Sequence, residues 1–462
     1  MSEPSDPHES AAQWRNWAGD ELCRPAAIER PRSIEELSAA IERAAREDRR
    51  VRVAGSGHSF SDIACSDGLL LLLDRLAGVL DVDRSSGLVR AQAGITIREL
   101  SRRLLEHGLA LENLGDIDVQ SIAGAISTAT HGTGAGLRNI PSQVAELKLV
   151  LADGSTLECS RELDPEVFGA ARVGLGALGA IAEVTLRCVP AFTLRGLDAP
   201  APLEDTLQRF EELALGNDHF EFFVFPHTDT ALTRTNNRVE QAPRPRGRVS
   251  AYVNDVLMTN HAFGLICRAG RRFPGRIPQL NRLVTRLEGS SERVESSAQI
   301  FASPRLVRFT EMEYALPRER LAEAVRRVME LVEQRGFAVP FPIEARAVAP
   351  DDAFLSTAAG RESGFVAVHM FRGMAWEPYF RAVEEIMDEL EGRPHWGKRH
   401  FQTAATLRPR YPDWDRFQAV RARLDPGGRF ANSWTDRVLG PIGALPTSPM
   451  APRPLPADAA GA

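Results

Sequence analysis

The sequence of 462 residues predicts an α+β fold, and two observations carry that prediction. Apolar residues at helical spacing follow capping residues at several points, which is typical of amphipathic helices. Short apolar runs also occur, and three of them, at residues 69–74, 79–82 and 87–93, succeed one another without an intervening helix. The chain therefore lacks the regular strand, helix, strand order of a parallel α/β sheet.

Two capping boxes predict the helices of the N-terminal part. Ser33-Ile-Glu-Glu36 precedes apolar residues at helical spacing, and a strand is expected after this helix at residues 51–54. Thr96-Ile-Arg-Glu99 opens a second helix, which is expected to run to about Glu106 and to end at Gly108.

Residues 143–159 predict a β-hairpin that turns at Ala152-Asp-Gly154. A helix is expected near residues 165–171 and a strand at 180–189. After Pro190 the sequence pattern changes, and a second domain is expected to begin there. Beyond that point strands are expected at 221–225, 249–253 and 365–371, helices at 317–334 and 377–390, and an exposed Arg/Pro-rich loop at 235–247.

Composition and charge narrow the class of protein. A hydrophobic content of 43% is ordinary for a globular chain, and a formal net charge of -6 argues against a nucleic-acid surface and a basic membrane patch. No apolar run approaches 18 residues, so no transmembrane span is expected. The N-terminus is polar and acidic, unlike a secretory signal, and the five cysteines are scattered without a CxxC pair. We therefore expect a cytoplasmic protein, with association to a membrane left open.

Residues 55–60 read GSGHSF and follow the strand expected at 51–54. Gly55 and Gly57 allow positive φ and close approach of a ligand to the main chain, and His58 would lie at the mouth of this turn. By itself the histidine is either an ordinary polar loop residue or part of a ligand site.

Two other glycine-rich stretches match nucleotide-binding motifs only in part. Residues 174–179 match GxGxxG, but a helix is expected before them and a strand after them, which is the reverse of a Rossmann site. Residues 131–136 read HGTGAG and form either a structural turn or an anion-binding nest of backbone N–H groups.

Two groups of charged residues are candidates for a site. Residues 395–400, HWGKRH, include one of the two lysines of the chain, Lys398, and form either a basic pocket or a solvated charge run. They lack the partners of a zinc site, so no metal is expected. Glu344 and Arg346 share one face of an expected strand, where they either pair structurally or line a pocket.

Together these stretches resemble the vanillyl-alcohol oxidase family of flavoproteins. Within it they are similar to the aldonolactone oxidases, which act on L-gulono-1,4-lactone or D-arabinono-1,4-lactone and have alditol oxidases as near relatives. The resemblance covers residues 14–440 and is carried by GSGHSF, SIAGAISTATHGTG, FTEMEY, HWGK and DPGGRFANSWTDRVLG.

The resemblance implies a PCMH-type FAD-binding domain of two subdomains, and a cap domain with an antiparallel sheet flanked by helices. The implied division gives the FAD-binding domain residues 1–190 and the substrate cap 191–390. Residues 391–440 are then a segment that returns to the flavin, and 441–462 a disordered tail.

The resemblance also implies the residues of the site. His58 matches the histidine that carries FAD through an 8α-histidyl bond, and the residues that match the substrate side of the flavin are Glu344, Arg346, Lys398 and Ser121. Glu344 either orients Arg346 or accepts the substrate's hydroxyl proton. The residues expected to hold FAD are Gly55, Ser56, Gly57, His58, Ser59, Gly115, Ser121, Gly124, Thr128, His131, Gly132, Thr133, Ile181, His395 and Lys398.

The implied reaction oxidises the C2 hydroxyl of an aldono-1,4-lactone by hydride transfer to flavin N5, with oxygen as acceptor and hydrogen peroxide as product. Gly115 favours oxygen, because a bulkier residue there obstructs its approach to the ring in this family. Met370, Phe371 and Arg372 replace a small hydroxyl residue of alditol oxidases, which favours a lactone ring. The alternative is an alditol or sugar oxidase, or a lactone dehydrogenase with another acceptor.

Overall fold

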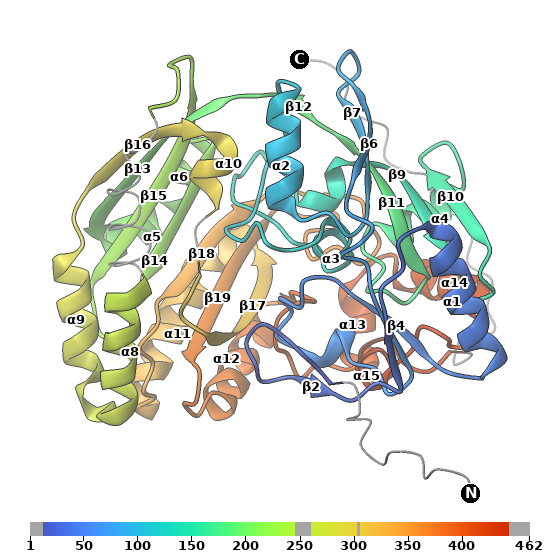
Figure 1. The fold of residues 1–462 in the computed structure, drawn as a ribbon. Coiled ribbons are helices and arrows are strands. Elements are labelled where there is room, and N and C mark those ends of the chain that lie inside the picture. Colours follow the sequence, from blue (N-terminus) through green and yellow to red (C-terminus); the bar gives the residue numbers. More distant parts are fainter. Residues whose placement is uncertain (1–12, 245–259, 303–304, 443–462) are drawn as a thin grey trace, which may run out of the picture.

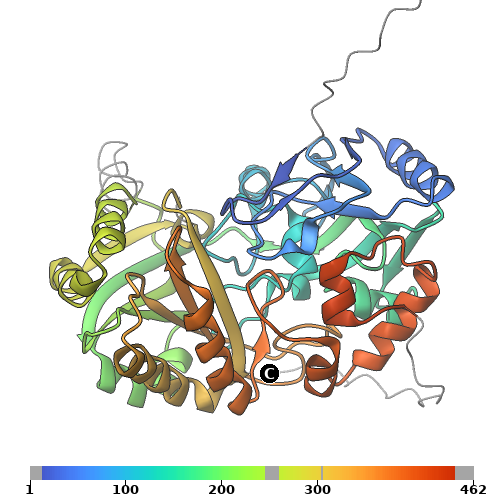
Figure 2. The same cartoon turned by 90° about the horizontal axis from the view of Figure 1, so that it is seen from below.

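The computed structural model describes residues 13–244, 260–302 and 305–442, and it consists of two lobes (Figure 1). The N-lobe contains residues 13–190 and 395–442, and the sheet lobe contains the described residues of 191–394. The helices of residues 404–439 lie beside the N-terminal strands, so the first and last described segments belong to the same lobe (Figure 2). The predicted division of the chain at residues 190 and 390 remains a prediction.

Two small sheets organise the N-lobe. A parallel sheet has the order β3-β5-β4, and an antiparallel sheet has the order β10-β9-β11-β7-β6, in which β9 and β10 form the predicted hairpin. The strands are β1 (Trp14–Arg15), β2 (Leu22–Cys23), β3 (Ala27–Glu29), β4 (Val51–Ala54), β5 (Leu69–Leu72), β6 (Val79–Asp83), β7 (Leu88–Gln92), β8 (Leu109–Ala110), β9 (Val144–Val150), β10 (Thr156–Ser160), β11 (Ala180–Arg187) and β12 (Val189–Pro190).

The predicted caps begin two helices of the N-lobe. The hydroxyls of Ser33 and Thr96 accept hydrogen bonds from the backbone N–H groups of Glu36 and Glu99. The helices are α1 (Ile34–Arg46), α2 (Ile97–Glu106), α3 (Ile122–Ser127), α4 (Pro165–Ala171), α13 (Ala404–Leu407), α14 (Trp414–Leu424) and α15 (Ser433–Leu439). Because α4 precedes residues 174–179 and β11 follows them, the reversed order that excludes a Rossmann site is confirmed.

An eight-stranded sheet of order β16-β13-β15-β14-β18-β19-β17-β20 forms the sheet lobe, and its neighbouring strands run antiparallel. The strands are β13 (Thr193–Pro202), β14 (His219–Val224), β15 (Thr230–Val239), β16 (Ser291–Ser296), β17 (Phe309–Pro317), β18 (Ile343–Val348), β19 (Ser363–Phe371) and β20 (Arg393–Pro394). The helices are α5 (Leu203–Gln208), α6 (Phe210–Leu215), α8 (Phe263–Arg272), α9 (Ile277–Leu287), α10 (Ser297–Phe301), α11 (Leu321–Arg335) and α12 (Glu377–Glu389).

The central strands have one apolar face and one polar face, because side chains alternate along a strand. In β17, for example, Met312 and Tyr314 pack with residues of α11 and α12, whereas Glu311 and Glu313 point to the other face. The apolar face builds a hydrophobic core against α5, α6, α11 and α12, so the polar face is left for a site.

Arg52 joins the returning C-terminal segment to the N-terminal sheet. Its guanidinium is 2% exposed and donates to the backbone carbonyls of Ile63, Leu175, Gly176 and Phe430. In addition, the backbone N–H of Val51 donates to the carbonyl of Arg429 at 2.7 Å. These bonds hold β4, and therefore the loop after it, against three distant segments.

Two sequence predictions need correction, and two others concern residues that the structure does not describe. Residues 235–239 belong to β15, where they pair with β13, and are not loop. The helix predicted from Pro317 begins at Leu321, because Pro317 ends β17 and residues 318–320 form a 3-10 turn. The strand predicted at 249–253 and residues 443–462 of the predicted tail lie outside the described residues.

We predict that Arg52→Met lowers the free energy of unfolding by about 3–5 kcal/mol, because four buried carbonyls lose their donor. Urea unfolding measures this change. Arg90→Met is the matched control: Arg90 is 48% exposed and 3.9 Å from Glu183, so its loss should cost less than about 0.5 kcal/mol. Equal losses in the two variants would contradict the role of Arg52.

Candidate active site

A cleft opens beside the loop that follows β4. Of the residues predicted to hold a cofactor, those that line it are Gly55, Ser56, Gly57, His58, Ser59, Ser121, Gly124, Thr128 and Ile181. They come from the loop after β4, from α3 with its flanking residues, and from β11. The fold therefore brings together three segments that the sequence separates widely.

The glycines of the cleft loop are required by close approach and by backbone conformation. A Cβ at Gly55 would lie 2.2 Å from the Ser121 hydroxyl, and Gly57 has φ of +71°. The Ser121 hydroxyl itself accepts from the Gly124 N–H and caps α3. A side chain at position 55 would therefore displace the Ser121 hydroxyl that caps α3.

His58 is a half-buried, neutral side chain at the edge of the cleft. Its ring stacks on Trp17 with 5.2 Å between the centroids, and its Nδ1 is buried without a hydrogen-bond partner in the described part of the protein. Burial, together with the positive charges of Lys398 and Arg308, lowers the pKa of His58 to about 4. At neutral pH the His58 ring is therefore uncharged, and its Nδ1 lies beside the cleft without a hydrogen-bond partner among the described residues.

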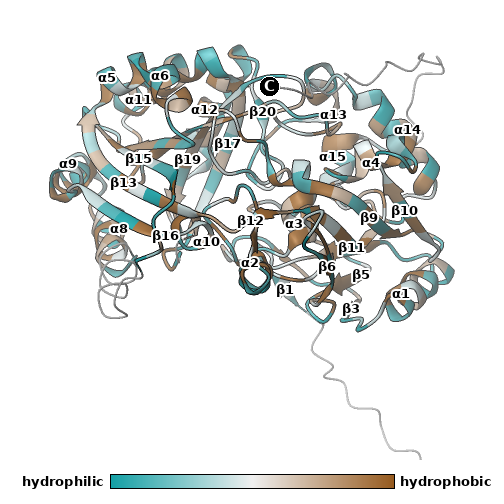
Figure 3. Cartoon of the chain, turned by 90° about the horizontal axis from the view of Figure 1, so that it is seen from above, coloured by the Kyte–Doolittle hydropathy of each residue, from teal (hydrophilic) through white to brown (hydrophobic). Residues whose placement is uncertain are grey.

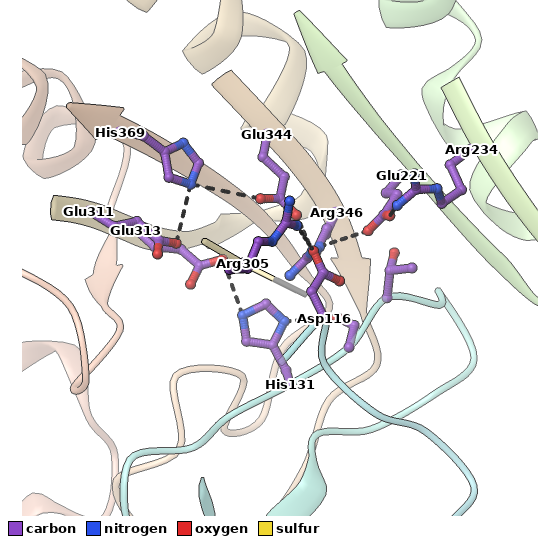
Figure 4. A network of polar contacts seen from close by, with 12 residues as sticks. Asp116, His131, Glu221, Arg234, Arg305, Glu311, Glu313, Glu344, Arg346 and His369 are labelled. Carbon is purple, nitrogen blue, oxygen red and sulfur yellow. Dashed lines mark hydrogen bonds and ion pairs between the residues drawn. The ribbon is translucent and has the colours of Figure 1, made fainter. Parts of the chain in front are cut away.

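The polar face of the sheet lobe carries a cluster centred on Arg346 (Figure 4). The Arg346 guanidinium forms ion pairs with Asp116 at 2.6 Å, with Glu221 at 2.8 Å and with Glu344. Oxygens of these three carboxylates come within 4.8 Å of one another. The Arg346 guanidinium lies among them.

Two further arginines balance the charge of this cluster. Arg305 reaches Asp116 at 3.0 Å, and Arg234 reaches Glu221 at 3.2 Å. Burial would raise the pKa of Asp116, but the positive charges of Arg346 and Arg305 bring it down to about 2. Glu344 differs: burial and the neighbouring carboxylates raise its pKa well above the usual range. Glu344 is therefore the carboxyl of this cluster that takes up a proton most readily.

His369 lies on the same face, between two carboxylates. Its Nε2 is 3.6 Å from Glu311 and 3.9 Å from Glu344, and its Nδ1 is 3.0 Å from the Pro342 carbonyl (Figure 4). Because a carbonyl only accepts, the Nδ1–H of His369 donates to it. The other ring nitrogen, Nε2, therefore faces the site.

Lys398 connects the cleft loop to this polar face. Its Nζ lies 2.5 Å from Glu311 and 5.0 Å from the centre of the Phe60 ring, in the GSGHSF stretch. The Phe60 N–H also donates to the carbonyl of Gly397 at 2.8 Å. Burial would raise the pKa of Glu311, but the positive charge of Lys398 brings it down to about 2.

A second buried group surrounds Glu313. His131 Nε2 lies 3.2 Å from Glu313, and His131 Nδ1 lies 2.8 Å from the Gly132 carbonyl. Burial, opposed by the charge of Glu313, lowers the pKa of His395 to about 3, so this ring is neutral. Both predicted histidines thus lie at the junction of the lobes rather than among the residues that line the cleft.

Some predicted site residues lie outside the cleft, and Ser121, which lines the cleft, lies outside the cluster centred on Arg346. Within the described part of the chain no contact joins Ser121 to Glu344, Arg346 or Lys398, and its catalytic role stays a prediction. Thr133 donates to the Phe220 carbonyl, which links the two lobes. The predicted roles of Gly115, Gly132 and Thr133 toward a cofactor also remain predictions, since none of them lines the cleft.

The sequence analysis overlooked His369, Glu311, Asp116 and Glu221. The i, i+2 spacing that singled out Glu344 and Arg346 occurs again in FTEMEY, and it would have found Glu311. One argument also needs correction. Met370 packs in the core under the helices, so the residue that β19 presents to the site is His369.

Comparison with known proteins fits this geometry. A family described as FAD binding domain matches residues 25–160, which include the cleft loop and α3. Cholesterol oxidase from Brevibacterium sterolicum has the same fold, with a TM-score of 0.78 at 18% identity over 95% of this chain and 100% of that chain. The fold and the cleft define an FAD-binding flavoprotein oxidoreductase.

The relatives define the family more narrowly. D-arabinono-1,4-lactone oxidase is the family that matches residues 184–438. L-gulono-1,4-lactone dehydrogenase of Mycobacterium tuberculosis is 53% identical over 93% of this chain and 99% of its own length. L-gulonolactone oxidase of Bos taurus is 33% identical, over 92% and 98% respectively. Alditol oxidase of a Streptomyces species is 31% identical over 92% of this chain and 98% of its own length. The chain belongs to the D-arabinono-1,4-lactone oxidase family.

The residues of the cleft fit FAD. The side-chain-free surface at Gly55 and Gly57 suits close contact with a phosphate-bearing ligand, and the hydroxyls of Ser56 and Ser59 lie in the cleft lining. The unpartnered Nδ1 of His58 provides a nitrogen for contact with the cofactor.

We predict that Glu311→Gln destabilises the protein at pH 7 by about 3 kcal/mol, and that this difference from the native protein shrinks as the pH falls. The pKa of Glu311 is about 2 in the folded protein, below its usual 4.5. Its ionised form therefore stabilises the fold above about pH 4.5, and this contribution is lost toward pH 2.

Urea unfolding between pH 7 and pH 3 measures the difference. Glu158→Gln is the control, because Glu158 is 62% exposed and pairs with Lys148. A difference for Glu311→Gln that stays constant with pH would show that the carboxylate charge is not what stabilises the fold.

Proposed function

We propose that this protein oxidises the C2 hydroxyl of an aldono-1,4-lactone. Bound FAD supplies the electron chemistry, since its N5 accepts the hydride. The observation that carries the proposal is the position of Lys398, which contacts both the loop of the FAD cleft and the polar face with Glu311, His369, Glu344 and Arg346. The names of the relatives support an aldonolactone as the substrate.

Turnover with a panel of substrates tests this proposal. L-gulono-1,4-lactone and D-arabinono-1,4-lactone should reduce a dye in the presence of the holoenzyme, and an open-chain alditol such as xylitol should not. Faster turnover of the alditol would favour the alternative of an alditol oxidase. No turnover of any lactone, in protein that contains FAD, would reject lactone oxidation.

The proposed attachment of FAD is a covalent bond from a ring nitrogen of His58 to the C8α carbon of FAD, in place of one hydrogen of that methyl group. The two electrons of the broken C–H bond pass to the electron acceptor of the enzyme. A neutral ring with a buried, unpartnered nitrogen supports this, because an unprotonated nitrogen is needed to form the bond. The stacked Trp17 holds the plane of the ring.

We predict that acid-precipitated protein stays yellow and that its intact mass exceeds the polypeptide mass by one FAD. His58→Ala should give the bare polypeptide mass, because the linking nitrogen is gone. His107→Ala, on the C-terminal side of α2 and outside the cleft lining, is the control and should keep the label. A bare mass for the native protein would contradict covalent attachment.

The proton of the substrate hydroxyl goes to Nε2 of His369 in this proposal. Pro342 fixes the tautomer, and the carboxylate of Glu311 lies where it stabilises the protonated ring. Lys398 and Arg346 provide positive charge near the developing alkoxide. Glu344 is the second candidate for the proton, because its raised pKa gives it a high proton affinity.

We predict that His369→Gln lowers kcat by about 10²–10⁴, the usual contribution of a general base, whereas Glu344→Gln has a smaller effect. The pH profiles distinguish the two candidates. If Glu344 accepts the proton, activity rises with pH as Glu344 ionises at its raised pKa, and Glu344→Gln abolishes that rise. That result would overturn the role given to His369.

Oxygen is the acceptor that we propose for the reduced enzyme, and Gly115 supports it only in part. A Cβ at Gly115 would lie 2.9 Å from the His131 carbonyl, so close packing already favours glycine there. The Mycobacterium tuberculosis relative is named a dehydrogenase and the Bos taurus relative an oxidase, which leaves a dehydrogenase as the alternative.

We predict that stopped-flow reoxidation in air is fast after anaerobic reduction by lactone, and that Gly115→Ala slows reoxidation more than reduction. The added methyl group would narrow the path of oxygen, although it also presses on the His131 carbonyl. The rate of reduction is the internal control for that second effect. Slow reoxidation of the native enzyme, with fast turnover on a dye, would favour the dehydrogenase.

A further inference from the structure

The segment that contains β1 and β2 forms a small hairpin against the GSGHSF loop of the FAD cleft. The two strands pair antiparallel over two residues each, and a turn of residues 16–21 joins them. We call residues 14–23 the strap. A two-stranded ribbon is at best marginally stable by itself in water, so the strap is held in place by its contacts with the rest of the protein.

Asn16 shapes the strap and bonds it to the GSGHSF loop. Its side-chain Oδ1 accepts from the backbone N–H groups of Gly19 at 2.8 Å, and of Asp20 and Glu21 at 3.1 Å. Its Nδ2 donates to the carbonyl of Ser59 at 3.1 Å, and the residue is buried. One side-chain amide therefore closes the turn and also fixes it on the loop.

Two tryptophans of the strap lie on the same loop. The backbone N–H of Trp17 donates to the carbonyl of Gly57 at 2.7 Å, and its ring stacks on the ring of His58. Trp14 lines the cleft and packs on a hydrophobic cluster of β4 and β5. Figure 3 shows β1 on the side of the N-lobe that carries β3 and β5. The strap therefore covers the part of the cleft at which His58 lies.

Arg399 holds the strap from the other side. Its guanidinium is 13% exposed and pairs with Asp20 at 2.6 Å and with Glu21 at 3.0 Å. Its Nε donates to the hydroxyl of Thr310 at 2.6 Å, and its Cζ lies 4.2 Å from the centre of the Trp376 ring. Because β17 and the start of α12 fix this guanidinium, Arg399 joins the strap to the sheet lobe.

Two other arginines of the sheet lobe also touch the strap. The Cζ of Arg308 lies 5.5 Å from the centre of the Trp17 ring, and a Cβ at Gly19 would lie 3.1 Å from the guanidinium of Arg372. A charge-assisted bond to a carboxylate is stronger than a cation–π contact at an exposed site. The two ion pairs of Arg399 are therefore the strongest of these contacts.

We propose that the strap is a gate for FAD and that Arg399 is its latch. FAD enters or leaves the cleft while the strap is lifted from the GSGHSF loop, and the pairs with Asp20 and Glu21 favour the closed position. Lifting the strap leaves the larger sheets intact, because the described β1 and β2 pair with each other in a sheet of two strands. The strap can therefore open as one unit.

The alternative is a static contact, in which Arg399 only adds to the affinity for FAD. The two roles differ in their kinetics. A gate has to open for uptake and for release, so a weaker latch speeds both rates. A contact that stabilises only the FAD-bound protein changes the rate of release and leaves the rate of uptake unchanged.

FAD exchange in the His58→Ala background tests this proposal, because no bond to residue 58 retains the cofactor there. In this background Arg399→Gln should speed the release of FAD, and its uptake by protein without FAD, each by roughly tenfold or more, because two charge-assisted bonds are lost. Flavin fluorescence measures both rates. The double variant Asp20→Asn, Glu21→Gln removes the same pairs and should have the same effect. Combining it with Arg399→Gln should add little, since these residues form one contact.

Arg416→Gln in the same background is the matched control. Arg416 is 17% exposed, pairs with Glu166 and Asp413, and lies 4.3 Å from the centre of the Phe354 ring. Its surroundings therefore resemble those of Arg399, but it joins α14 to α4 and not to the strap. Both FAD rates should stay unchanged in this variant.

Hydrogen exchange of the holoenzyme with His58 present gives a second measurement. Arg399→Gln should speed the exchange of backbone N–H groups in residues 14–23 and leave α1 unchanged. Arg416→Gln should change neither segment. These measurements follow FAD and the strap, not lactone turnover or the covalent bond, so a failure of the proposed function is seen separately.

Three results would overturn the proposal. The first is faster release with unchanged uptake in Arg399→Gln, which would make Arg399 a static contact. The second is an equal effect of Arg399→Gln and Arg416→Gln, which would be a general loss of stability. The third is faster exchange in the strap without a change in either FAD rate, which would show that the strap opens without controlling FAD.

Discussion

The guanidinium of Arg346 is the contact on which the site depends. It pairs with carboxylates from three segments, Asp116 of the N-lobe, Glu221 of β14 and Glu344 of β18. A buried ion pair costs desolvation, and losing one partner leaves an uncompensated charge, so the three acids and the arginine must fold together. This requirement couples the N-lobe, which holds FAD, to the sheet lobe, which carries the polar face.

The rest of the site follows from alternation along antiparallel strands. The residues of β14, β17, β18 and β19 that point to the helices form a hydrophobic core, and their neighbours point to the polar face. One face of the sheet therefore packs in the hydrophobic core and stabilises the fold, and the opposite face carries the polar residues of the site. Lys398 then brings the polar face against the GSGHSF loop through Glu311 and Phe60.

Much of the local structure could be predicted because its causes are local. The caps at Ser33 and Thr96, the β9–β10 hairpin and the glycine loop with His58 are all set by residues a few positions apart. The stretches that resemble a known family, such as GSGHSF, predicted residues that line the cleft. Glu344 and Arg346 were found because they share a face of one strand.

The remaining site residues depend on contacts between distant segments. Asp116 pairs with Arg346 across 230 positions, and nothing near Asp116 in the sequence indicates that partner. His369 was missed because its role depends on the register that places it opposite Glu311.

The central claim is that C2 of a lactone gives its hydride to FAD on this polar face. The most direct measurement is the rate of anaerobic flavin reduction by L-gulono-1,4-lactone, monitored by absorbance in a stopped-flow instrument. The rate is compared between the lactone with hydrogen at C2 and the lactone with deuterium at C2. A primary isotope effect on bleaching is predicted for deuterium at C2, and none for deuterium at C3. Bleaching that is insensitive to deuterium at C2 but sensitive at another carbon would contradict the account.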